Sequence, residues 1–318
     1  MRLFLTLNVI AGGWLGLSLS VQPTQTTSVQ PAQNARYDRE ATIRWILQQE
    51  VEQGGFLLRP PPANLDVAPQ PSLRATSGAV RALLYLGAPI PHIDRHQQFI
   101  LRCYDPHTGS FSEPGGQPDV PLTSVGILAA TALQIPPKEY AKAWEYLHRQ
   151  AKNFEDIRIA AAAVESAGLK NCPFDVRPWI AQAREVVKQA LKRDPADGGA
   201  RDLGSAVALI LRLGGNLTEE ETQHCIQVLH EGQRADGGWG KPGSKHSDLE
   251  TTYRVMRAFV HLRSKPRDLP ALQRFLAALR SPHGAYAVAP AEPSTMSGTY
   301  YAAAILHWME QWEHHPKK

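Results

Sequence analysis

A Gly-rich loop in the last third of the chain, GWGKPGSKHSDLETTYRVMRAF, gathers the side chains best suited to chemistry. Its basic residues are Lys241, Lys245 and His246, two acids follow at Asp248 and Glu250, and an apolar run typical of a buried helix comes next. Backbone N–H groups at a helix N-terminus attract anions, so the basic residues predict a binding site for an anion. The two acids predict an acid–base role beside it.

The same loop also has a purely structural interpretation. Ser247 and Glu250 match the S-x-x-E capping box, and Asp248 would suit the positive end of the helix dipole. That interpretation leaves the acids without a function. It does not explain Lys241 and Lys245, because positive charge beside a helix N-terminus is unfavourable unless an anion lies there. An ordinary solvated loop is the alternative for these lysines, and the sequence leaves both interpretations open.

Two aromatic residues are further candidates for contact with a ligand. Trp239 opens the loop and Tyr300 begins the last apolar helix, although each could instead pack in the core. The histidines form no spaced pair backed by acids, and Cys103, Cys172 and Cys225 are too scattered for a zinc motif. We therefore predict no metal site and no cofactor.

Internal repeats indicate which elements position these residues. Four segments share a Gly, then an aromatic residue, a polar loop and an apolar helix. The gap between the second and third aromatic is close to three periods of about 43 residues, so two degraded repeats are expected inside it. The aromatic positions are Phe56, Phe111, Trp239 and Tyr286, and the two degraded repeats would place Phe154 and Ala200 there.

Each repeat predicts a pair of helices of different character. The first helix carries charged residues at helical spacing, as in AKAWEYLHRQA and TEEETQHCIQVLHEG. The second is apolar almost all round, as in SVGILAATAL, so it must be buried on most faces. Six such pairs predict an all-α fold, an (α/α)6 toroid (barrel) with two concentric rings of helices. An open solenoid of helix pairs is the alternative.

Two stretches carry a resemblance to a known superfamily. QRADGGW, which ends at Trp239, fits the Q-x-x-x-G-x-W repeat of squalene and hopene cyclases and the D-G-G-[FW] repeat of protein prenyltransferase β-subunits, and RSPHGAY, which ends at Tyr286, is a degraded copy. The chain therefore resembles the prenyltransferase / squalene-hopene cyclase (terpenoid cyclase) α/α-toroid superfamily over about residues 38–310. The resemblance implies that the N-termini of the inner helices surround a deep apolar cavity for isoprenoid chains.

The loop is similar to a β-subunit motif, G-R-P-x-K-x-x-D-x-C-Y. With one residue inserted, the resemblance implies that Lys241 and Lys245 hold a lipid diphosphate and that Asp248 stands at the first zinc position. Glu250 replaces the zinc-binding Cys, and Ser294 stands where the family has a zinc-binding His. Because two of the three ligands are missing, zinc-dependent prenylation of a thiol is not expected.

The cyclase side of the superfamily suggests another role for the acids. Its D-x-D-D-T motif protonates an alkene through the middle acid, and DLETT keeps Asp248 and Glu250 at the first and middle positions. A Glu250 left un-ionised by burial in an apolar cavity would be a proton donor.

These observations predict a toroid that binds an isoprenoid or similar lipid (di)phosphate in a central apolar cavity, with transferase or cyclase turnover that does not use zinc-thiolate chemistry. The alternative is a non-catalytic toroid that binds a peptide, a lipid or a partner protein. A net charge of only +4, without a long basic run, argues against nucleic acid as a partner.

The N-terminal segment predicts export. Arg2, the apolar stretch of residues 3–19 and the small residues that end at Ser20 are typical of a signal peptide at residues 1–20, for a periplasmic or extracellular protein. An uncleaved membrane anchor is the alternative and the only case in which membrane contact is expected. Residues 21–37 are rich in Gln, Thr, Ser and Pro, which predicts a flexible linker, and residues 311–318 are predicted to be a tail.

Overall fold

The structure is a computed structural model that describes residues 38–62 and 68–314. The predicted signal peptide, its membrane-anchor alternative and the linker all fall on residues 1–37, outside the described residues. The chain from Asp38 onward forms one compact unit. No helix in the described part of the chain is long and apolar enough to cross a lipid bilayer.

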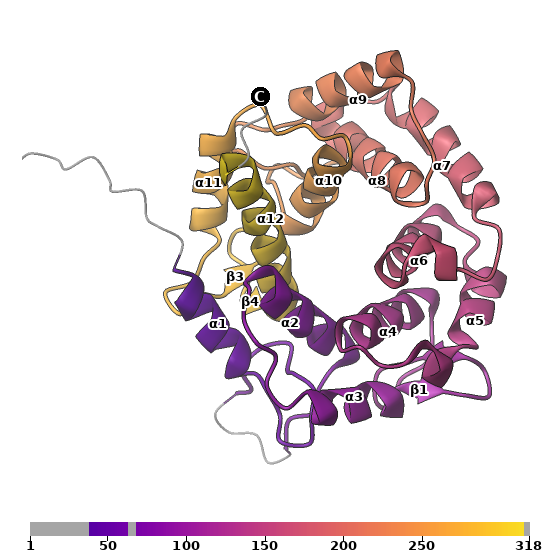
Figure 1. The fold of residues 1–318 in the computed structure, drawn as a ribbon. Coiled ribbons are helices and arrows are strands. Elements are labelled where there is room, and N and C mark those ends of the chain that lie inside the picture. The colour runs from indigo at the N-terminus through magenta and orange to yellow at the C-terminus, as the bar shows by residue number, and fades with distance from the viewer. Residues whose placement is uncertain (1–37, 63–67, 315–318) are drawn as a thin grey trace, which may run out of the picture. The chain divides into compact units, whose positions relative to one another are not determined.

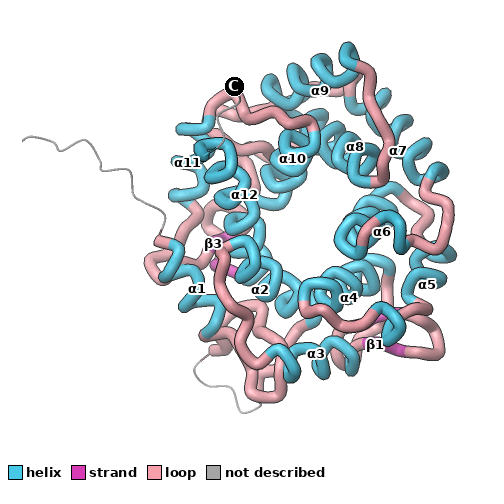
Figure 2. The backbone as a smooth tube through the Cα atoms, in the orientation of Figure 1, coloured by secondary structure: helices cyan, strands magenta, loops and turns pink. Residues whose placement is uncertain are grey.

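Helices of that unit form two concentric rings, which Figures 1 and 2 show end-on. The inner ring consists of α2 (Leu73–Tyr85), α4 (Val120–Ala132), α6 (Phe154–Ala167), α8 (Ala200–Arg212), α10 (Leu249–His261) and α12 (Met296–His314). The outer ring consists of α1 (Arg39–Leu47), α3 (Ile93–Arg102), α5 (Ala143–Gln150), α7 (Arg177–Ala190), α9 (Glu219–Glu231) and α11 (Leu269–Ala278). Three short helical turns lie between them, at Pro137–Tyr140, Leu169–Asn171 and Pro195–Gly199.

The inner helices close into a ring because each buries its flanks against two neighbours. Each inner helix contacts the next along the chain, and α12 returns to pack on α2. At the seam the Thr42 hydroxyl of α1 donates to the carbonyl oxygen of Gly284 at 2.7 Å, and Arg39 pairs with Glu310 of α12 at 2.6 Å. The predicted all-α toroid is therefore confirmed, and the open solenoid is wrong. The last inner helix also extends to His314, four residues into the segment predicted as a tail.

One hydrogen bond fixes the aromatic turn in four of the six repeats. The backbone N–H of each repeat aromatic donates to a threonine hydroxyl in the first turn and a half of the inner helix that follows, at 2.9–3.1 Å. Each aromatic side chain is then at most 2% exposed beneath its helix. The pairs are Phe56 with Thr76, Phe111 with Thr123, Trp239 with Thr252, and Tyr286 with Thr299. Two of these turns contain short antiparallel strand pairs, β1 (Tyr104–Asp105) with β2 (Ser110–Phe111) and β3 (Tyr286–Ala287) with β4 (Ser294–Thr295).

The two degraded repeats differ from the other four in the connection between helices. Phe154 and Ala200 are the first residues of α6 and α8, and not members of a turn that precedes those helices. The polar loop has been lost in the third repeat, where α5 ends at Gln150 and α6 begins at Phe154. The spacing of about 43 residues thus identified the repeats correctly, but it placed their aromatic positions on a different element.

Candidate functional site

A cavity of about 970 Å³, open in part to solvent, lies at the centre of the inner ring and takes lining residues from all six inner helices. The lining side chains recur three, four and seven residues apart, which is the spacing of one helix face. The most frequent type is arginine, and three tyrosines come from α10 and α12. The arginines are Arg74, Arg81, Arg158, Arg212, Arg254 and Arg257, and the tyrosines are Tyr253, Tyr300 and Tyr301.

The prediction of an apolar cavity needs one correction, because charged side chains share its lining with apolar ones. An inner helix packs on two neighbours and on the outer ring, and its apolar residues lie at those three contacts. The remaining face points to the axis, where water can reach it, and carries the polar residues. An apolar wall is limited mainly to α4 and α6, at Val125, Leu128, Ile159 and Ala162.

At the N-terminal end of the inner helices the arginines are matched by acids. Arg254, 6% exposed, pairs with Glu155 at 3.0 Å and with Glu250 at 2.5 Å. Lys241 reaches in from the loop to Glu250 at 3.3 Å. Glu155 and Glu250 lie in the first turns of α6 and α10, and Arg254 lies one turn further along α10.

This pairing reverses the protonation state expected for Glu250. Burial alone would raise the pKa of its carboxyl, but Arg254 and Lys241 more than offset that effect and lower the pKa to about 2. Glu250 is therefore ionised at neutral pH. The expectation that burial keeps it protonated as a proton donor is wrong, because Arg254 and Lys241 lie against its carboxylate.

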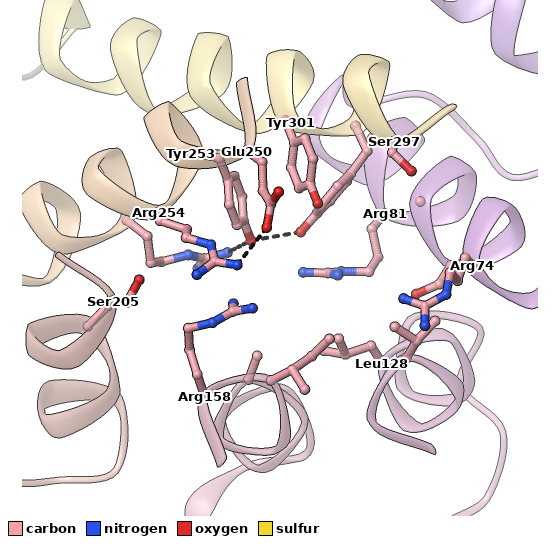
Figure 3. A pocket seen from close by; sticks show the side chains of 18 of the residues that line it. Arg74, Arg81, Leu128, Arg158, Ser205, Glu250, Tyr253, Arg254, Ser297 and Tyr301 are labelled. Atoms are coloured by element: carbon pink, nitrogen blue, oxygen red, sulfur yellow. Dashed lines mark hydrogen bonds and ion pairs between the residues drawn. The ribbon is translucent and has the colours of Figure 1, made fainter. Parts of the chain in front are cut away.

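In the middle of the cavity the arginines have fewer acidic partners among the described residues. Arg81 of α2 and Arg158 of α6 point into the cavity, as Figure 3 shows. Arg81 lies over the ring of Tyr300 at 4.5 Å, and no hydrogen bond or ion pair joins it to any residue that the structure describes. Arg158 has one acidic partner, Glu155, at 3.1 Å, and Arg254 shares that carboxylate.

A hydroxyl pair lies beside Arg81. The phenol oxygens of Tyr253 and Tyr300 are 2.9 Å apart, and Arg257 donates to the Tyr253 oxygen, also at 2.9 Å. Arg257 also donates to Tyr85 at 3.2 Å and stacks on Trp308 at 4.6 Å. This cluster joins α2, α10 and α12 on one side of the cavity.

Toward the C-terminal ends of the inner helices the cavity continues into a second chamber of about 980 Å³. The two share Arg81, Leu128, Ala162 and Arg257 in their linings. Glu165 is the acid of this chamber, within 3.2–3.9 Å of His261, Arg212 and Arg257. Leu84, 52% exposed, supplies apolar surface there.

The structure separates the loop residues of the predicted site. Lys241 is 48% exposed and reaches the cavity through Glu250, whereas Lys245 and His246 lie exposed in the loop. Tyr300, 6% exposed, lines the cavity as a candidate ligand contact. A role for Lys245 and His246 in anion binding stays a prediction.

Asp248 and Trp239 have structural partners. Asp248 is the N-cap of α10 and accepts from the Thr251 backbone N–H at 2.9 Å and from its hydroxyl at 2.8 Å. The capping box expected at Ser247 is therefore wrong, because Asp248 alone caps the helix and the Ser247 hydroxyl donates to Asp236 instead. Trp239 is 1% exposed, and its indole N–H donates to the carbonyl oxygen of Leu229, so its ring faces protein and not the cavity.

Sequence reasoning missed the arginines and Tyr253. A signal for them exists, because a helix buried on most faces has little reason to carry arginine unless one face borders a cavity. In RATSGAVRALL the two arginines, Arg74 and Arg81, are seven residues apart on one helix face. In TTYRVMRAFV they are three apart, at Arg254 and Arg257.

Comparisons with known proteins agree with this architecture. The sequence model of the prenyltransferase alpha-alpha toroid domain matches residues 19–168 and 204–317. The chain belongs to this family. No curated protein matches the sequence significantly. Within the described residues, no group of three or more His, Cys, Asp or Glu side chains is placed to hold a metal ion.

Solved structures with a similar fold include terpene cyclases. The type II terpene cyclase MstE from Scytonema is 9% identical, with a TM-score of 0.54 over 86% of this chain and 97% of that chain. A variant of MstE in complex with its substrate, geranylgeranyl dihydroxybenzoate, is 11% identical, with a TM-score of 0.53 over 86% and 95%. A protein from Actinoplanes is 13% identical, with a TM-score of 0.54 over 86% and 99%. At such identities the likeness is one of fold alone.

Proposed function

We propose that the toroid binds an isoprenoid or similar lipid-like molecule with an anionic head group, such as a phosphate or diphosphate, in its central cavity. The cavity has two kinds of wall that suit such a ligand. Leu128, Ile159 and Ala162 offer apolar surface to a hydrocarbon chain, and the arginines offer charge to a head group. MstE, which shares the fold, binds geranylgeranyl dihydroxybenzoate, an isoprenoid chain joined to a benzoate.

The observation that carries the proposal is that Arg81 lies in the cavity without a carboxylate partner among the described residues. The linings of the two chambers contain six arginines against Glu165 and Glu250. Positive charges crowded in a partly desolvated space repel one another, and a bound anion removes that cost. Arginine is also well suited to phosphate and carboxylate oxygens, because its planar fork can donate two hydrogen bonds at once.

The proposal is binding, with no step of catalysis attached. Asp248 is engaged as a helix cap, and Glu250 is an ionised partner of Arg254 and Lys241. Glu250 has no proton to give at neutral pH, because Arg254 and Lys241 lower its pKa to about 2. These contacts favour a binding protein over a cyclase that starts its reaction through these two acids.

Calorimetric titration of the purified protein with farnesyl diphosphate and with farnesol tests the proposal. We expect the diphosphate to bind at least about tenfold more tightly than the alcohol, since each lost charge-assisted hydrogen bond costs about 1.5–3 kcal/mol. Arg81→Gln and Arg158→Gln should each weaken diphosphate binding about tenfold or more. Arg177→Gln, at an exposed position at the start of α7, is the matched control and should not change it.

The alternative location for the anion is the loop, and Lys241→Ala combined with Lys245→Ala tests it. Lost affinity in this double variant, with full affinity in the Arg81 and Arg158 variants, would move the anion site to the loop. Equal affinity for farnesyl diphosphate and farnesol would contradict an anion site of either kind.

A further inference from the structure

The Tyr253 hydroxyl lies in an environment that favours a negative charge on it. Its oxygen accepts a hydrogen bond from Arg257 at 2.9 Å and lies 2.9 Å from the Tyr300 hydroxyl. Arg81 lies 4.5 Å from the centre of the Tyr300 ring. The Tyr253 oxygen thus lies among hydrogen-bond donors and positive charge, and no carboxylate forms a hydrogen bond with it within the described residues.

Groups on the helix of Tyr253 and on three other helices also bear on this residue. Those with positive charge or a hydroxyl are Arg81 and Tyr85 on α2, Arg212 on α8, Arg257 on α10, and Tyr300 and Tyr301 on α12. The nearest acids, Glu165 and Glu250, are engaged by Arg257, Arg212 and Arg254. The field at Tyr253 is therefore positive overall.

This field decides which of the two phenols loses its proton first. Burial would raise the pKa of Tyr253, but Arg257 and Arg81 outweigh burial and lower the pKa to about 7. Burial holds the pKa of Tyr300 well above its usual value. When Tyr253 is ionised, its oxygen can only accept, and Tyr300 is then the donor in the hydrogen bond between the two.

We propose that Tyr253 is the acid–base group of the cavity: its phenolate balances Arg81 and Arg257 in the free protein, and it takes up one proton from solvent when a phosphate-class anion binds beside Arg81. The proton balances, since one O–H bond forms on Tyr253 and the bound anion replaces the phenolate as the counter-charge. The inference rests on the proposed function for its ligand, and it adds a residue that would touch that ligand and exchange a proton in its presence.

Proton uptake makes anion affinity depend on pH with a definite sign. Below about pH 7 Tyr253 is already protonated, and binding needs no further proton. Above that pH the free protein must gain a proton in order to bind, so the dissociation constant rises by up to about tenfold per pH unit. Tyr253→Phe removes this dependence and leaves the arginines in place.

Ultraviolet absorbance of tyrosinate, with inorganic sulfate as the probe, tests the inference, because sulfate does not titrate in this pH range. In the full chain we expect one phenolate to appear with a midpoint of about 7, and saturating sulfate to abolish it at pH 8. Tyr253→Phe should lack the signal. Tyr146→Phe, on the outer helix α5, is the control and should keep it.

A calorimetric measurement of wild-type protein keeps the test independent of how well the variant folds. Sulfate titrated in two buffers with different ionisation enthalpies reports the protons taken up, and we expect about one per sulfate at pH 8. A phenolate that appears only at the ordinary tyrosine pKa of about 10 would overturn the inference. So would sulfate binding without proton uptake.

Different results would contradict the proposed function and the inference about Tyr253. Farnesyl diphosphate binding at pH 6 tests the proposed function alone, because Tyr253 is protonated there with or without a ligand. If the diphosphate binds at pH 6 but no phenolate forms near pH 7, only the inference about Tyr253 is wrong. If the phenolate forms but neither anion binds, the proposed function is wrong, and the proton uptake is wrong with it.

Discussion

Arg254 and Arg81 line the same cavity but differ in their burial and in their partners. Arg254 is almost fully buried and has two carboxylate partners, Glu155 and Glu250. Arg81 is less buried and has only the face of Tyr300. A buried charge is stable when it is paired. Arg254 therefore maintains the protein structure, and Arg81 is available to a ligand.

Replacing Glu250 by Gln tests the charge balance at the level of single residues. It removes one negative charge from the cavity lining, so we expect farnesyl diphosphate to bind roughly fivefold more tightly. The unfolding temperature should fall at the same time, because Arg254 loses a partner. Glu185→Gln, exposed on α7, is the control and should change neither quantity. Weaker binding in the Glu250 variant would contradict a cationic anion site.

The stability of the protein in acid should depend on Glu165, the carboxylate of the second chamber. Burial would raise the pKa of Glu165, but His261 at 3.2 Å and the charges of Arg212 and Arg257 lower it from 4.5 to about 2. The stabilisation is therefore complete above pH 4.5 and is lost as the pH falls toward 2, with a size of about 3 kcal/mol. Urea unfolding between pH 6 and 2 should show a fall in midpoint that is smaller in Glu165→Gln. An equally steep fall in the variant would contradict this assignment.

Sequence alone predicts individual residues unevenly. The sequence suggests Tyr300 as a candidate ligand contact, and its side chain lines the cavity. The sequence also suggests that Asp248 interacts with the N-terminus of the buried helix, and Asp248 is the N-cap of α10. The arginines could not be assigned, because an apolar helix does not reveal which of its faces points to the axis. The pKa of Glu250 could not be assigned either, since it depends on Arg254 one turn along the helix and on Lys241 across the loop.

At the level of elements, the fit between the aromatic turns and the inner helices depends on glycine in one repeat. A Cβ added to Gly126 of α4 would overlap the ring of Phe111, whereas one added to Gly78 of α2 would make only ordinary contacts with Met296 and Tyr300. Both glycines lie inside inner helices, so they form a matched pair.

We expect Gly126→Ala to lower the free energy of unfolding by about 1–3 kcal/mol, which is the usual cost of overpacking a core. Gly78→Ala should leave it unchanged or raise it by up to about 1 kcal/mol, because alanine favours the helix. Urea denaturation of the two variants measures both values. Equal effects would show that the Phe111 ring yields to the new methyl group.

Elements were predicted better than their connections. The alternation of charged and apolar helices identified both rings, because a helix that is buried on more faces carries a larger share of apolar residues. The lost loop ahead of α6 was not foreseen, since spacing alone cannot show whether Phe154 belongs to a turn or begins a helix.

At the level of the whole molecule, closure of the ring joins the first repeat to the last. Because α12 packs on α2 and the buried Thr42 hydroxyl binds Gly284, the described unit should unfold in one cooperative transition. Thr42→Val should shift that whole transition by about 1–3 kcal/mol, because the carbonyl oxygen of Gly284 loses its donor. Circular dichroism and tryptophan fluorescence should then give superimposable curves.

Thr222→Val, on the outer helix α9, is the control for the seam and should have a smaller effect. Two separate transitions in the wild-type protein, or a transition that splits in Thr42→Val, would contradict a closed and cooperative ring.

The central claim is that an anion binds inside the ring, and anomalous X-ray diffraction from crystals that contain selenate tests it most directly. Selenium marks the position of the anion without any assumption about the rest of the ligand. The account predicts a peak within hydrogen-bond reach of Arg81 and Arg158, beside the Tyr300 hydroxyl. A peak at Lys245 and His246 in the loop, with none inside the ring, would contradict it.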